Sequence, residues 1–147
     1  MKTIIAAVDF SDASGIVIES ASEMARAFSA GLHLVHVVEA QPTYAAYGFS
    51  PDEVPVLHQV QEETMIRGEK KLSELADGMA AQCVQTKLLH GQPLASILEY
   101  ADEVSADLLV MGSHGHGVLG SILLGSVAEG CVRKAKVPAL IVPVKRQ

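Results

Sequence analysis

The chain has 147 residues, of which 49% are hydrophobic and 19% are charged, and it carries a formal net charge of −6. These values exclude a disordered chain and fit one globular domain, 1–147, that is large enough to fold without a disulfide or a metal. They also argue against a nucleic-acid surface, which needs a basic patch, and no apolar run is long enough to span a membrane.

Apolar runs typical of buried strands alternate with helical patterns along the chain. The predicted strands span 2–8, 32–38, 83–89, 107–111 and 138–144, and the predicted helices span 12–30, 56–81, 93–104 and 126–135. This alternation predicts an α/β fold, in which a parallel sheet carries helices on both faces.

Residue types at the helix ends suggest caps. Ser11 is expected to cap the first helix and Gly31 to end it. At the last helix, Ser126 and the glutamate three residues later, Glu129, have the spacing of a capping box.

The segment 41–55 contains three prolines and is expected to form a long loop before the second helix. Its aromatic residues could fold over a ligand, form an oligomer contact or simply pack, and packing is the favoured reading; they are Tyr44, Tyr47 and Phe49. In the helix that follows, Val60 and Leu72 are expected on one apolar side, and Gly68 weakens the helix locally.

A glycine-rich pattern follows the fourth predicted strand. Gly112 and Gly115 are separated by two residues, and after nine more residues come Gly125 and Ser126. Glycines let backbone amides approach an anion, and a helix N-terminus adds free N–H groups and a positive dipole end. The pattern predicts a phosphate site. Asp9 is expected in the same crevice, because ligands bind beyond the carboxyl ends of parallel strands.

Two other phosphate signatures overlap this segment and are discounted. The spacing at 115–120 matches a dinucleotide fingerprint, but it does not join a strand directly to a helix and lacks the acidic residue about 20 positions later. The spacing at 120–126 matches a Walker A loop, but Ser126 stands where the lysine is required. Ser126 could also act only as a helix cap, and Asp9 only as a turn residue.

The histidines do not suggest a metal centre or a catalytic triad. His114 and His116 alternate without a suitably spaced third ligand. The other histidines look like scattered strand or surface residues; they are His33, His36, His58 and His90. We therefore assign no catalytic residue from the sequence. The two cysteines, Cys83 and Cys131, form no CxxC pair and are expected as buried thiols in a reducing, cytoplasmic setting.

The long glycine pattern, placed here, resembles that of the universal stress protein family in its UspA-like, ATP-binding branch. The resemblance covers the whole chain and is carried by several segments together: 7–11, 36–38, 110–115, 124–128 and 137–143. It implies a single Rossmann-like domain, similar to adenine nucleotide α-hydrolases, with five parallel strands in the order 3-2-1-4-5 and four helices.

The resemblance also implies roles for individual residues. Asp9 would contact the ribose, or the phosphates through Mg²⁺, while Ala7 and Val37 would line an adenine pocket. The phosphates would meet the amides of Gly112, Gly115, Gly125, Ser126 and Val127, and the Ser126 hydroxyl. Val8, Met111 and His114 complete the implied nucleotide-binding set. Ala128 lacks a hydroxyl that some family members offer there.

Three functions fit these observations. The first is a stress-response switch or chaperone-like partner that binds ATP, or else AMP or ADP, and is read by an unidentified protein. The second is a slow Mg²⁺-dependent ATPase. The third is a dimeric module whose nucleotide is structural, since family members pair the last strand, 138–144, across a two-fold axis. The sequence does not decide among ATP, AMP and cyclic AMP. An ATP pyrophosphatase is disfavoured because no glycine-rich loop follows the first strand.

Overall fold

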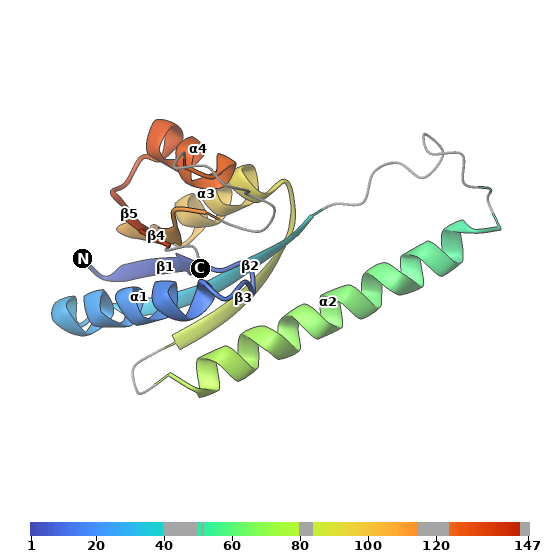
Figure 1. Cartoon of the computed structure of the whole chain (residues 1–147), viewed down its shortest axis with the longest axis horizontal. Coiled ribbons are helices and arrows are strands. Elements are labelled where there is room, and N and C mark those ends of the chain that lie inside the picture. The colour runs from blue at the N-terminus through green and yellow to red at the C-terminus, as the bar shows by residue number, and fades with distance from the viewer. Residues whose placement is uncertain (40–49, 51, 80–83, 115–123, 145–147) are drawn as a thin grey trace.

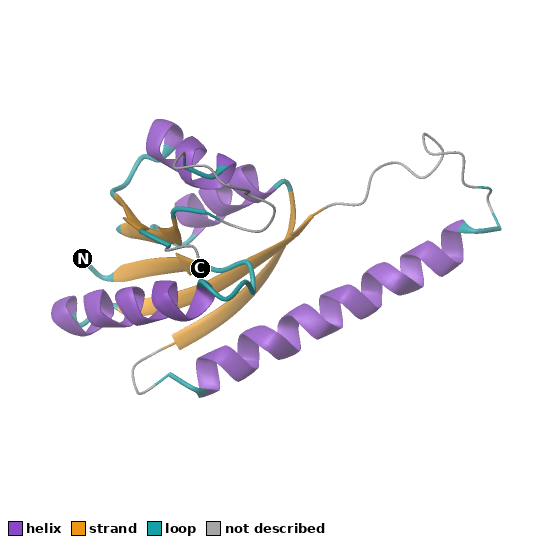
Figure 2. Cartoon of the chain, in the orientation of Figure 1, coloured by secondary structure: helices purple, strands orange, loops and turns teal. Residues whose placement is uncertain are grey.

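The computed structural model describes residues 1–39, 50, 52–79, 84–114 and 124–144. Strands and helices alternate in this part of the chain, as the sequence pattern predicts (Figure 2). In chain order they are β1 (Thr3–Ala7), α1 (Ser14–Phe28), β2 (Gly31–Glu39), α2 (Val54–Asp77), β3 (Val84–Gly91), α3 (Pro93–Glu103), β4 (Leu108–Gly112), α4 (Ser126–Lys134) and β5 (Ala139–Val142).

The five strands form one parallel sheet in the order β3-β2-β1-β4-β5, which confirms the predicted fold and strand order. β1 lies at the centre, where Ile5 pairs with His33 of β2 and with Leu109 of β4. The last strand is an edge strand that pairs with β4 within the described residues, and it is shorter than the predicted 138–144.

The core lies on both faces of the sheet because alternate residues of a strand point to opposite faces. Ile4 and Ala6 belong to the cluster that packs under α1 and α2, whereas Ile5 belongs to the cluster under α3 and α4 (Figure 1). All three side chains are fully buried. Burial of an Ile-sized side chain contributes about 1.5–3 kcal/mol, so this central strand anchors both layers.

The ends of α1 differ from the predicted caps. Ala13 is the N-cap and provides no side-chain hydrogen bond, whereas the N–H of Ser11 donates to Asp9 Oδ1 in the preceding turn (3.0 Å). The helix ends before Gly31, because Ser29 adopts the left-handed conformation (φ 50°) and its N–H donates to helix carbonyls. The predictions for Ser11 and Gly31 were therefore wrong, and Gly31 begins β2.

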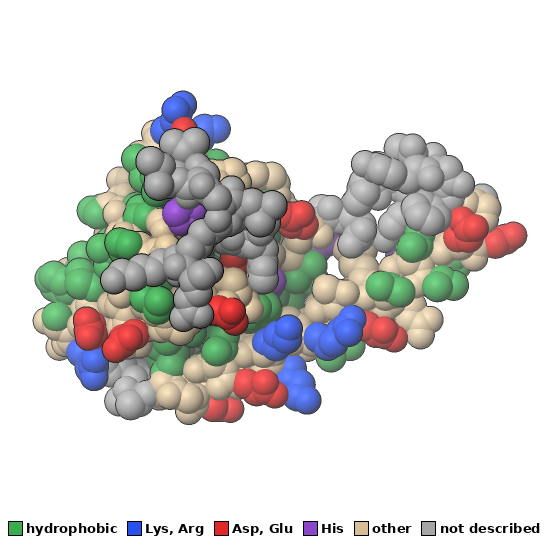
Figure 3. Space-filling model, viewed as in Figure 1, with side chains coloured by type: hydrophobic (Ala, Val, Ile, Leu, Met, Phe, Trp, Pro, Cys, Tyr) green, Lys and Arg blue, Asp and Glu red, His purple; other side chains and the backbone are tan. Residues whose placement is uncertain are grey.

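α2 is the longest of the described helices, and its N-terminal part projects beyond the sheet (Figure 1). Leu72 is buried against the sheet as predicted, but Val60 is 52% exposed. Figure 3 shows hydrophobic side chains on the projecting part of the helix. Gly68 lets the helix approach β3, because a Cβ there would lie 3.0 Å from Leu88 Cδ1. None of the described helices is both long and apolar enough to cross a membrane.

Cys131 of α4 provides a test of the packing under α3 and α4. Its side chain is fully buried, and burial raises the pKa of the thiol from 9.0 to about 11. We expect iodoacetamide to alkylate it at pH 8 at least about 100-fold more slowly in the folded protein than in urea, since the thiolate is the reactive form. Mass spectrometry of a Cys83→Ser variant, which keeps one thiol, measures both rates.

The same pKa shift fixes the sign of the pH dependence. The folded state holds the neutral thiol, so this contribution to stability is complete below pH 9 and is lost as the pH rises toward 11. Equal alkylation rates in the folded and unfolded protein would show that α4 does not pack as described.

Candidate functional site

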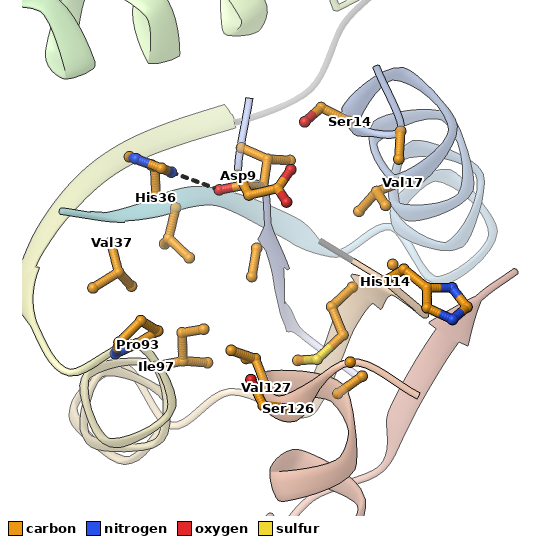
Figure 4. A pocket seen from close by; sticks show the side chains of 18 of the residues that line it. Asp9, Ser14, Val17, His36, Val37, Pro93, Ile97, His114, Ser126 and Val127 are labelled. Atoms are coloured by element: carbon orange, nitrogen blue, oxygen red, sulfur yellow. Dashed lines mark hydrogen bonds between the residues drawn. The ribbon is translucent and has the colours of Figure 1, made fainter. Parts of the chain in front are cut away.

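A cavity of about 400 Å³ lies at the carboxyl ends of β1, β2 and β4, bounded by the first turns of α1, α3 and α4 (Figure 4). This is the place where the chain passes from one side of β1 to the other, and α/β sheets commonly bind ligands there. The volume lies within the range typical of small-molecule sites.

The structure brings together almost the whole set of residues predicted from the sequence. The cavity is lined by Ala7, Val8, Asp9, Val37, Met111, Gly112, His114, Gly125, Ser126 and Val127. Gly115, His116 and the aromatic residues of the segment 41–55 lie outside the described residues, so the predictions for them stay predictions.

Asp9 is held at the rim of the cavity by a specific turn after β1. Its Oδ1 accepts the N–H of Ser11 (3.0 Å), and Phe10 between them adopts a left-handed conformation (φ 63°). The Phe10 ring stacks on His36 with ring centroids 4.1 Å apart, and Lys71 Nζ lies 5.3 Å from its centroid. Strained backbone of this kind persists where the surrounding packing holds it, and it often marks a functional site.

His36 supports the same turn from β2. Its Nδ1 lies 2.8 Å from the carbonyl oxygen of Val8, so Nδ1 carries the proton and donates (Figure 4). His36 is a strand residue, as predicted, but its side chain also lines the cavity, and this role was not predicted. Its place beside Val37, at the carboxyl end of a predicted strand, was the available signal. His33 instead lies 2.8 Å from the hydroxyl of Tyr100 on α3.

The N-terminus of α4 faces the cavity without a side-chain cap. Gly125 is the N-cap, in extended conformation, and Ser126 is the first helical residue. The predicted capping box is therefore wrong. Glu129 pairs with Arg133 (3.0 Å), four residues further along the helix. The first N–H groups of a helix have no acceptor inside it, so the amides of Ser126 and Val127 are suited to an anion, with the Ser126 hydroxyl beside them.

An apolar part of the cavity lining comes partly from α3. Pro93 and Ile97, from the first turns of this helix, lie beside Val37 (Figure 4). This helix was predicted from the sequence, but its place in the site was not, because helical spacing does not show which turn reaches a neighbouring strand. An apolar surface of this kind suits an aromatic ring, whereas the N-terminus of α4 suits negative charge.

The charges around the cavity are unusual for an anion site. Among the described lining residues the charged side chains are Asp9 and Glu39, and there is no Lys or Arg.

Two buried polar atoms of lining residues, Ser14 Oγ and His114 Nε2, have no hydrogen-bond partner in the described part of the chain. Buried polar atoms are almost always paired, so such atoms are candidates for contact with a ligand or water. Among the described residues no cluster of three or more His, Cys, Asp or Glu side chains could hold a metal.

Comparisons with known proteins agree on one family. The sequence profile described as "Universal stress protein family" matches residues 1–143. Universal stress protein A homolog 1 of Coxiella burnetii is 33% identical over 144 residues, which cover 98% of this chain and 97% of that protein.

Solved structures of universal stress proteins share the fold. One from Lactobacillus plantarum has a TM-score of 0.76 at 23% identity, covering 96% of this chain and 97% of that chain. Another, solved in complex with cAMP, has a TM-score of 0.64 at 27% identity and covers 97% of this chain and 96% of that one.

Proposed function

The chain belongs to the universal stress protein family, and we propose that it binds an adenine nucleotide in the cavity at the carboxyl ends of β1, β2 and β4. The observation that carries the proposal is that an apolar surface and an uncapped helix N-terminus line the same cavity. The relative solved with cAMP supports this ligand class.

The two kinds of lining, apolar and amide, suggest how the nucleotide would lie. The adenine would rest against Val37, Pro93 and Ile97, and the ribose would face Asp9. The phosphates would meet the amides of Ser126 and Val127. Because the described lining residues include no Lys or Arg, backbone amides and the α4 dipole would have to balance the phosphate charge.

We propose ATP as the preferred nucleotide, and with it membership of the ATP-binding branch. The long spacing of Gly112, Gly115 and Gly125 supports this, since it offers backbone amides along more than one phosphate. Mg²⁺ fits only as a companion of the nucleotide. One carboxylate at the rim, Asp9, could add an oxygen ligand to those of the phosphates, which is the usual way Mg²⁺ is held.

The role we propose is regulatory: the bound nucleotide sets the shape of the site, and a partner protein reads it in a stress response or chaperone-like role. The features present are those of binding, namely amides, a helix dipole and an apolar wall. Slow hydrolysis of ATP and a purely structural nucleotide remain the alternatives.

A homodimer through 138–144 is a further proposal, supported by the position of β5 at the sheet edge, where backbone groups are available for pairing. A cytoplasmic location also stays a prediction.

Calorimetry on protein stripped of carried-over nucleotide tests this proposal. We expect ATP to bind at least about tenfold more tightly than AMP, and AMP more tightly than adenosine. Each added phosphate accepts further hydrogen bonds, and these are strengthened by its negative charge. Repeating the titration with and without Mg²⁺ shows whether the ion contributes. Equal affinity for ATP and AMP would overturn the preference for ATP, and absence of binding to all three ligands would overturn the proposed function.

A further inference from the structure

Ser113, the residue directly after β4, joins three segments of the chain. Its N–H donates to the carbonyl of Val142 (2.8 Å), and its own carbonyl accepts the N–H of Gly125 (2.7 Å). Its Oγ accepts the N–H of Val144 (3.0 Å). Ser113 is 8% exposed, so these bonds are largely shielded from water. Hydrogen bonds are stronger in the protein interior than in water.

The bond to Gly125 ties the start of α4 to the end of β4. Gly125 is the N-cap of the helix, so its position determines where the amides of Ser126 and Val127 point. Anion recognition by amides depends on placement within a fraction of an ångström. Any shift of Ser113 would therefore move the donors that we propose for the phosphates.

The Ser113 hydroxyl also contacts the imidazole of His114. Oγ lies 2.9 Å from His114 Nδ1. In the neutral tautomer whose Nδ1 accepts the hydrogen of this hydroxyl, the imidazole carries its proton on Nε2. Nε2 is buried without a hydrogen-bond partner among the described residues, and in this tautomer it is a donor that a phosphate oxygen would satisfy.

We infer that Ser113 is a positioning residue for the phosphate groups of the bound nucleotide. It acts through Gly125, which starts α4, and through His114, while the Val144 amide anchors its hydroxyl. The inference rests on the proposed function. It also links the phosphate side of the site to the chain that follows the edge strand β5, because Val144 lies two residues beyond the end of that strand.

Titration of ATP and of adenosine into the full-length chain tests this inference. In Ser113→Ala we expect the affinity for ATP to fall about tenfold and that for adenosine to stay within about twofold, because only the phosphates depend on the hydroxyl. Ser113→Thr keeps the hydroxyl and should restore most of the ATP affinity. A merely structural role would lower both affinities in parallel, and that result would overturn the inference.

Val144 offers a second test that leaves Ser113 unchanged and that serves if Ser113→Ala does not fold. Val144→Pro removes the N–H that anchors the hydroxyl, whereas Val144→Ala keeps it and only shortens the side chain. We expect the proline variant to lose more ATP affinity than the alanine variant, with adenosine binding retained in both.

The outcomes distinguish failure of the inference from failure of the proposed function on which it rests. If the wild-type chain binds ATP and the proline and alanine variants of Val144 bind it equally, the inference is overturned and the proposed function stands. If the wild-type chain binds neither ATP nor adenosine, the proposed function is overturned, and the inference, which rests on it, is overturned as well.

Discussion

Replacing Asp9 by asparagine should weaken the binding of ATP, AMP and adenosine by similar factors, about tenfold to hundredfold. The amide oxygen of asparagine can keep the bond that Oδ1 now accepts from the Ser11 N–H, so the turn after β1 survives. The change removes the negative charge and one acceptor. A hydrogen bond to a charged group contributes about 1.5–3 kcal/mol, which corresponds to this loss if the carboxylate accepts ribose hydroxyls.

The pattern across the three ligands decides between the two roles proposed for Asp9. Calorimetric titrations with and without Mg²⁺ provide it. An equal loss for all three assigns Asp9 to the ribose, whereas a loss confined to ATP in the presence of Mg²⁺ would assign it to the metal and contradict this prediction. Asp12→Asn is the matched control, since this exposed residue makes the same charge change outside the cavity lining and should leave the affinities unchanged.

The location of the site could be predicted because it follows from patterns that are local in the sequence. Strands and helices alternate, so Asp9 and Gly112 had to fall at the carboxyl ends of parallel strands. The strand order then places those ends at one edge of the sheet. The structure confirms that both residues line one cavity.

The contacts that hold the site in shape could not be predicted in the same way. Ser113 and Val144 are 31 residues apart, and the hydrogen bond between them uses a backbone N–H, which every residue except proline possesses. His36 meets the carbonyl of Val8 across 28 residues for the same reason. Backbone groups leave no signature in residue types, so such contacts appear only once the strands are placed.

The errors at the helix ends also have a physical cause. Ser11 and Ser126 have the residue type of an N-cap, but that position depends on backbone conformation. At α4, Gly125 takes the extended conformation and becomes the N-cap, which leaves Ser126 inside the first turn. The same shift directs a helix N-terminus toward the cavity without a side chain to occupy it, so the failed prediction and the candidate anion site have one origin.

Leu109→Ala should reduce the free energy of unfolding by about 2–5 kcal/mol, the largest change in stability that we predict. Leu109 is fully buried in β4, where it pairs with Ile5 of β1 and Ala139 of β5. Its side chain belongs to the cluster beneath α3 and α4. Truncation would leave a cavity between the sheet and these two helices. This cavity could close only if the elements that border the site moved.

Urea denaturation followed by circular dichroism measures this change. Val132→Ala is the control: it removes an aliphatic side chain from α4 that is 59% exposed, and should change stability by less than about 0.5 kcal/mol. A loss below about 1 kcal/mol for Leu109→Ala would contradict the packing described for this face. Since ligands stabilise only the folded state that binds them, saturating ATP should recover part of the loss, provided that the site keeps its shape when the core beneath it is weakened.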